Sequence, residues 1–147
     1  MNYLHRFQVK APLSRVAAFH QQHTSMSAIT PPPMRVEYQR LPADFSGELE
    51  FTLWFGPLPI RWIARIEDVS ASGFTDRQVS GPFAKWEHRH SFHSVDDQTT
   101  EVVDQISLQL KSHPVWGPVG LAFMLGLPFL FAYRGWKTRR LLEKGSQ

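Results

Sequence analysis

The 147-residue chain contains no cysteine. Disulfide bonds, thiolate zinc sites and cysteine nucleophiles are therefore excluded, and the composition fits a reducing compartment such as the cytoplasm. Residues Met1–Lys10 alternate polar and apolar side chains, so they lack the apolar core of a signal peptide. We expect a cytoplasmic protein.

Most of the chain also lacks net charge. The formal net charge is +3, but residues 134–147 alone sum to +4, which leaves −1 for the rest. A domain that binds nucleic acid normally carries a basic surface, so we expect no nucleic-acid partner. We interpret the basic tail as a solvated helix end that complements the helix dipole, with contact to anionic lipid as the alternative. Its basic residues are Arg134, Lys137, Arg139, Arg140 and Lys144.

Charge is missing altogether from Pro114–Tyr133, a run about as long as a membrane span. The run contains Gly117, Pro118, Gly120, Gly126 and Pro128, which predict that no uninterrupted helix fills it. We expect instead a helix that begins near Val119 and covers an apolar sheet face. Peripheral contact of this segment with a membrane is the alternative.

The length and composition predict one globular domain over residues 1–147, with 42% hydrophobic and 20% charged residues. Alternating apolar and polar side chains predict strands over 2–10, 34–40, 46–55, 60–69 and 100–111. Two more strands share 73–92 and are joined by a turn at Ser80-Gly81-Pro82. Short helices are predicted at Ser14–His20 and His23–Thr30. Strands that follow one another as hairpins indicate an antiparallel sheet, hence an α+β fold.

The strand after the Ser80-Gly81-Pro82 turn has an unusual inward face. Its period of two places Trp86, His88, His90 and Phe92 together on that face. Two imidazoles between two aromatic side chains are either hydrogen-bonded core histidines or part of a cavity wall.

Neighbouring strands add Asp76, Gln78 and Asp104 to the same face. A buried carboxylate is costly unless it is paired. We therefore predict that at least one inward Asp lies within hydrogen-bond distance of His88 or His90.

Three roles are open for this polar group. It can form an internal network that fixes strand register, it can orient a ligand, or it can move protons. The candidates for proton transfer are His88, His90, Asp76 and Asp104. His88-x-His90 with one Asp would also suit a metal, but such spacing in strands is common by chance, and we expect neither metal nor cofactor.

Two further features are interpreted as surface. His20 and His23 straddle a helix end, and we expect both to lie on the surface. Trp54 falls on the polar face of its strand, where an exposed aromatic ring favours a homodimer contact.

Four segments resemble the SRPBCC superfamily, which includes START domains, the birch-pollen allergen and polyketide cyclases. They are FQVKAPLSRVAAFH (Phe7–His20), PLPIRWIARIED (Pro57–Asp68), GFTDRQVSGPFAKWEHRHSF (Gly73–Phe92) and LFAYRGWKTRRLL (Leu130–Leu142). They look most like the small bacterial branch of that superfamily. The resemblance implies the helix-grip fold, in which a curved seven-stranded antiparallel sheet wraps around a long C-terminal helix. Two short helices follow the first strand.

The resemblance also implies an apolar cavity between sheet and C-terminal helix, where members bind lipids, sterols, polyketides or plant hormones. We therefore expect a carrier or sensor of a small hydrophobic ligand that is lipid-, polyketide- or isoprenoid-like. One alternative is a polyketide cyclase/dehydratase-like enzyme that uses the inward His and Asp groups, and another is a membrane-peripheral lipid-handling protein. The superfamily has no fixed catalytic motif to compare.

The residues expected to contact the ligand lie on the inward strand faces and the C-terminal helix. They are Phe51, Leu53, Trp62, Phe74, Gln78, Phe83, Trp86, His88, His90, Phe92, Asp104 and Met124.

Overall fold

The computed structural model describes residues 1–144, with side chains through Glu143. The elements in chain order are β1 (Asn2–Val9), α1 (Leu13–His20), α2 (His23–Ala28), β2 (Met34–Arg40), β3 (Gly47–Phe55), β4 (Leu58–Ser70), β5 (Gly73–Ser80), β6 (Phe83–Asp96), β7 (Thr99–Leu110) and α3 (Trp116–Lys144). The predicted strands and short helices are confirmed, with boundaries that shift by a few residues.

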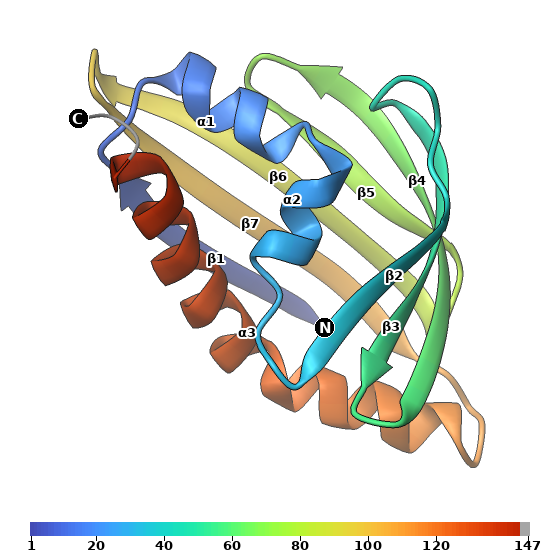
Figure 1. Ribbon diagram of the computed structural model, residues 1–147. Coiled ribbons are helices and arrows are strands. Elements are labelled where there is room, and N and C mark those ends of the chain that lie inside the picture. Colours follow the sequence, from blue (N-terminus) through green and yellow to red (C-terminus); the bar gives the residue numbers. More distant parts are fainter. Residues whose placement is uncertain (145–147) are drawn as a thin grey trace.

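All seven strands form one antiparallel sheet in the order β1-β7-β6-β5-β4-β3-β2. Figure 1 shows that the sheet curves and that α1, α2 and α3 all lie over its concave side. The chain therefore has the predicted helix-grip fold.

Side-chain alternation explains how the sheet positions its core. Leu49, Phe51 and Leu53 of β3 are buried, and so are Trp62 and Ile66 of β4. These side chains project toward the helices, as expected from the period of two. The apolar face of the sheet thus forms the core of the protein and faces α3.

Helix α3 corrects one prediction. It runs without interruption from Trp116 to Lys144 and includes Pro128, so the expectation that glycine and proline break the run was wrong. Pro118 lies in the first turn, where the missing N–H has no helical partner to lose. Leu127 and Phe131, on either side of Pro128, are buried in the core. Tertiary packing therefore outweighs the cost of a proline inside the helix.

A side chain caps the start of α3. The Nδ1 atom of His113 accepts the N–H groups of Val115 and Trp116 at 3.1 Å each. These are among the N–H groups that a helix start leaves without backbone partners. The helix consequently begins three residues before the predicted Val119. In Figure 1 α3 changes direction along its length, as a helix with an internal proline does.

The outward side of α3 stays apolar. Within residues 1–144 it is the one helix that is long and apolar enough to cross a membrane. Only 22% of its apolar stretch is buried inside the protein. Leu125 is 68% exposed and Phe129 84% exposed. Membrane contact of this segment, the alternative to a helix that only covers the sheet, stays a prediction. The side chain of Lys144, which was assigned to the basic tail, lies outside the described part of the chain.

Trp54 is engaged within its own sheet. Its indole Nε1–H donates to Glu37 Oε1 at 3.2 Å, and the Arg35 guanidinium lies 5.3 Å from the ring centroid. The exposed-aromatic argument for a dimer is thereby weakened, and the homodimer stays a prediction.

Candidate ligand-binding site

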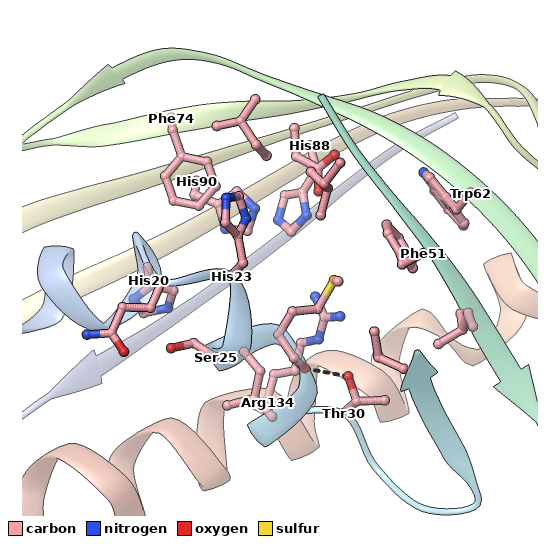
Figure 2. A pocket seen from close by; sticks show the side chains of 18 of the residues that line it. His20, His23, Ser25, Thr30, Phe51, Trp62, Phe74, His88, His90 and Arg134 are labelled. Carbon is pink, nitrogen blue, oxygen red and sulfur yellow. Dashed lines mark hydrogen bonds between the residues drawn. The ribbon is translucent and has the colours of Figure 1, made fainter. Parts of the chain in front are cut away.

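A cavity of about 110 Å³ lies between the concave sheet face, α2 and α3. Figure 2 shows the sheet above it and the helices below and beside it. Most of the wall is hydrocarbon or aromatic, and histidines, Asp76 and Arg134 supply the charged and titratable groups. The lining residues are His20, Gln22, His23, Ser25, Met26, Ile29, Thr30, Met34, Val36, Phe45, Leu49, Phe51, Leu53, Trp62, Ile66, Phe74, Asp76, Trp86, His88, His90, Phe123, Leu130 and Arg134.

Strand register brings the polar residues of the sheet together. One cross-strand row aligns Asp76 with His88, and the next row aligns His90 with Asp104. Directly opposite or diagonal residues on one sheet face lie close enough to interact. Asp104 therefore has one histidine opposite it and another on the diagonal.

The predicted Asp–His contact is confirmed, and it uses the diagonal pair. His88 Nε2 and Asp104 Oδ1 lie 2.8 Å apart, and both residues are buried. A carboxylate can only accept, so the Nε2–H of His88 donates and Nδ1 keeps its lone pair. Burial lowers the pKa of His88 despite the hydrogen bond to Asp104. Burial raises the pKa of Asp104, but the hydrogen bond from His88 and the proximity of His90 outweigh it, and the net shift is downward. The pair is thus a neutral imidazole held by a carboxylate.

His90 stacks on His88 with ring centroids 3.7 Å apart and on Phe74 at 4.2 Å. Its Nδ1 lies 3.4 Å from Asp104 Oδ1 but is aligned too poorly for a hydrogen bond. Burial, followed by the neighbouring His88, lowers the pKa of His90 to about 4. His20 packs nearby, and burial lowers its pKa to about 4 as well. Both imidazoles are neutral at neutral pH.

Arg134 supplies the positive charge of the cavity. Figure 2 shows its side chain rising from α3 into the space beneath the sheet histidines. Its Nε is buried and has no hydrogen-bond partner within residues 1–144. Burial lowers the pKa of Arg134, and the charges of Asp104 and Asp76 oppose that shift. Because a guanidinium stays protonated in proteins, this is a fixed cation in an apolar wall.

Asp76 faces Arg134 and His90 across the cavity without a bond to either. Its Oδ1 is buried and lacks a partner among the described residues. Burial raises the pKa of Asp76, and the neighbouring His90 and Arg134 partly counteract the rise. The cavity therefore offers an unpaired cationic donor beside a carboxyl group whose neutral form is favoured.

Asp76, His88 and His90 are close enough to be tested as a metal site, since one ligand atom from each lies within 4.8 Å of the others. The two imidazole rings are stacked at an interplanar angle of 27°. Ring-nitrogen lone pairs lie in the ring plane, so stacked rings direct them side by side instead of toward one ion. The Arg134 guanidinium also adds positive charge to the same cavity. The arrangement therefore fits an anionic group better than a cation.

The structure places the predicted ligand contacts in two groups. Seven of them line the cavity: Phe51, Leu53, Trp62, Phe74, Trp86, His88 and His90. The other five lie outside its wall. Phe83 and Phe92 are fully buried in the core, and Met124 packs against the core. Gln78 bonds to the backbone N–H and C=O of Phe83 across the hairpin. Asp104 lies behind His88, which it holds in place.

Sequence reasoning missed His20, His23 and Arg134. Both histidines line the cavity, so the expectation that they lie on the surface was wrong. The interpretation of Arg134 as part of a solvated basic end was wrong too. The sequence did indicate a buried position, because Leu127, Leu130 and Phe131 lie on one helix face and Arg134 follows on the same face at helical spacing. Arg134 was assigned to the basic tail by its charge, whereas the helical spacing of the apolar residues would have assigned it to the buried face.

Comparison with solved structures supports the fold. A protein from Thermus thermophilus matches with a TM-score of 0.75 at 14% identity, covering 100% of both chains. An aromatase/cyclase from a Streptomyces species matches with a TM-score of 0.77 at 16% identity, covering 100% of this chain and 96% of that one. A START superfamily protein from Mycobacterium smegmatis matches with a TM-score of 0.72 at 14% identity, covering 97% of each.

These likenesses show that the chain has the helix-grip fold, which it shares with the START superfamily protein and the aromatase/cyclase. No protein-family model matches the sequence, and no curated protein matches it either.

Proposed function

We propose that this chain binds a small hydrophobic compound with an acidic, oxygen-bearing head, and that it acts as a carrier or sensor of that compound. The apolar body of the compound lies against the aromatic wall of the cavity, and the head lies at Arg134. The structural neighbours include a START superfamily protein and aromatase/cyclases, which supports a hydrophobic ligand as the class.

The observation that carries this proposal is the unpaired Nε of Arg134 inside a mostly apolar cavity. Leaving a buried donor unpaired costs about 1–3 kcal/mol, and more when the group is charged. A carboxylate, phenolate or enolate oxygen would satisfy that donor with a charge-assisted hydrogen bond. A cavity that is apolar except for a few directed polar groups is the usual design of a small-molecule site.

The test compares a short acid with its neutral ester. Hexanoate and methyl hexanoate are titrated into the protein while the indole NMR signals of Trp62 and Trp86, both in the cavity wall, are followed. The proposal expects the acid to shift these signals at lower concentration than the ester. It is contradicted if the ester binds as tightly as the acid, or if neither compound perturbs the two indoles.

A second candidate is an enzyme of the cyclase/dehydratase type. The observation in its favour is the Asp104–His88 pair, in which the carboxylate orients a neutral imidazole in the cavity wall. The free Nδ1 of His88 can accept a proton from a carbon acid, and Asp104 would stabilise the imidazolium that forms.

The His88→Gln variant separates the two candidates. If the protein is an enzyme, this variant still binds the acid but loses cyclisation or dehydration of a poly-β-ketone substrate by a factor of roughly 10²–10⁴, the usual contribution of a general base. His93→Gln, on the exposed side of β6, is the matched control. Turnover that is the same in both variants would eliminate the acid–base role.

A further inference from the structure

A second apolar hollow, which we call the outer groove, opens beside the cavity and has a volume of about 490 Å³. It runs between α3, the tip of the β3–β4 hairpin and the proline segment that precedes β2. Its walls include Val119 and Gly126 of α3, Phe55 and Leu58 of the hairpin, and Pro31–Pro33. Except for the hydroxyl of Tyr133, the side chains that line it within residues 1–144 are hydrocarbon, aromatic or thioether groups.

The cavity and the outer groove share three wall residues, namely Met34, Phe123 and Leu130. These three side chains therefore form the partition between the two spaces. All three are apolar, and a methionine is flexible enough to adapt its shape to a neighbour. The apolar chain of a ligand that passes from the cavity into the groove would therefore contact only apolar side chains at this partition.

The two volumes decide how much of a ligand each space can hold. A dry cavity of about 150 Å³ binds a single benzene ring. The inner cavity, at about 110 Å³, therefore has room for a polar head and only a short apolar segment. The remaining apolar part of a longer ligand must lie elsewhere, and the adjoining groove is more than large enough to receive it.

Gly126 keeps the groove open at its α3 wall. A Cβ built at this position would meet no heavy atom within 4 Å, so a side chain here would occupy free space. Glycine in a helix interior costs about 1 kcal/mol relative to alanine. The residue thus leaves room in the groove at the expense of helix stability.

We propose that the cavity and the outer groove form one two-part site for an amphipathic ligand with an acidic head and a long apolar chain, such as a fatty acid. The head binds Arg134. The chain passes between Met34, Phe123 and Leu130 and lies against Gly126 in the groove. This inference rests on the proposed function, because it assumes that the head occupies the cavity.

The experiment measures the affinity of straight-chain acids from butanoate to dodecanoate by calorimetry. In the wild-type protein each added methylene is expected to tighten binding by about fourfold while the chain extends along the groove. In Gly126→Phe the short acids bind as before, but the gain per methylene stops once the chain reaches the filled groove. Gly126→Leu is expected to do the same to a smaller degree and serves if the phenylalanine variant does not fold.

Ala132→Phe is the matched control, since it places the same ring at an exposed position of α3 outside both spaces. It should follow the wild-type series. The inference is overturned if both folded Gly126 variants bind dodecanoate as tightly as the wild type. In that case butanoate and hexanoate binding would still support the proposed function, whereas failure of every acid to bind the wild type would refute both.

Discussion

Replacing Arg134 with Gln is expected to weaken the binding of decanoate by roughly fiftyfold, because a hydrogen bond to a charged group contributes about 1.5–3 kcal/mol. The substitution removes the one guanidinium among the described residues that line the cavity. Methyl decanoate carries no charge, so its affinity should hardly change. The measurement is calorimetric titration of both ligands into both proteins.

Arg140→Gln is the control for net charge. Arg140 is exposed on the same helix and packs against Trp136, outside the cavity. Losing one positive charge there changes the net charge of the protein by the same amount as the Arg134 variant does, but it removes no cavity donor. Equal affinity of Arg134→Gln and wild type for decanoate, with both variants folded, would show that the head does not bind Arg134.

Replacing Asp104 with Ala is expected to lower the free energy of unfolding by roughly 3 kcal/mol, since removing one partner of a buried pair leaves the other without compensation. His88 would keep a buried N–H with no acceptor, and Arg134 would lose a nearby negative charge. For a chain of this size the midpoint of thermal unfolding should fall by about 10 °C. The measurement is thermal and urea denaturation.

Two variants sharpen that result. Asp104→Asn keeps an oxygen that can accept the His88 N–H, so it should cost clearly less than the alanine variant. Asp97→Ala removes an exposed carboxylate from the β6–β7 turn and should change stability by at most about 0.5 kcal/mol. If Asp104→Ala were as stable as Asp97→Ala, the buried pair would not hold the sheet face together.

The fold could be predicted because it depends on patterns that a sequence carries directly. The period of two in β3, β4 and β6 and the turn after Ser80 set the strands and their hairpin order. The presence of helix α3 could be predicted, but its start and its continuity could not. Its glycine and proline residues predict a break, whereas burial of Leu127 and Phe131 against the sheet keeps the helix continuous.

The site could be predicted only in part, for a related reason. Alternation put His88, His90 and Asp104 on one face. The sheet register sets His90 directly opposite Asp104, yet the hydrogen bond goes to the diagonal His88, and that choice depends on side-chain orientation. Arg134 comes from the other side of the cavity, and its position near this group depends on how α3 crosses the sheet. The residue pattern of a single strand does not indicate how a distant helix crosses the sheet. The place of His20 depends likewise on how α1 packs against β6.

The Arg134 donor and the apolar space beside it are the basis of the proposed binding mode, and a crystal structure of the protein with decanoate tests that mode most directly. We expect the carboxylate within hydrogen-bond distance of the Arg134 guanidinium and the chain between Met34 and Phe123, with its end near Gly126. Decanoate bound with its carboxylate in solvent, or bound at a position outside the cavity, would contradict the proposal.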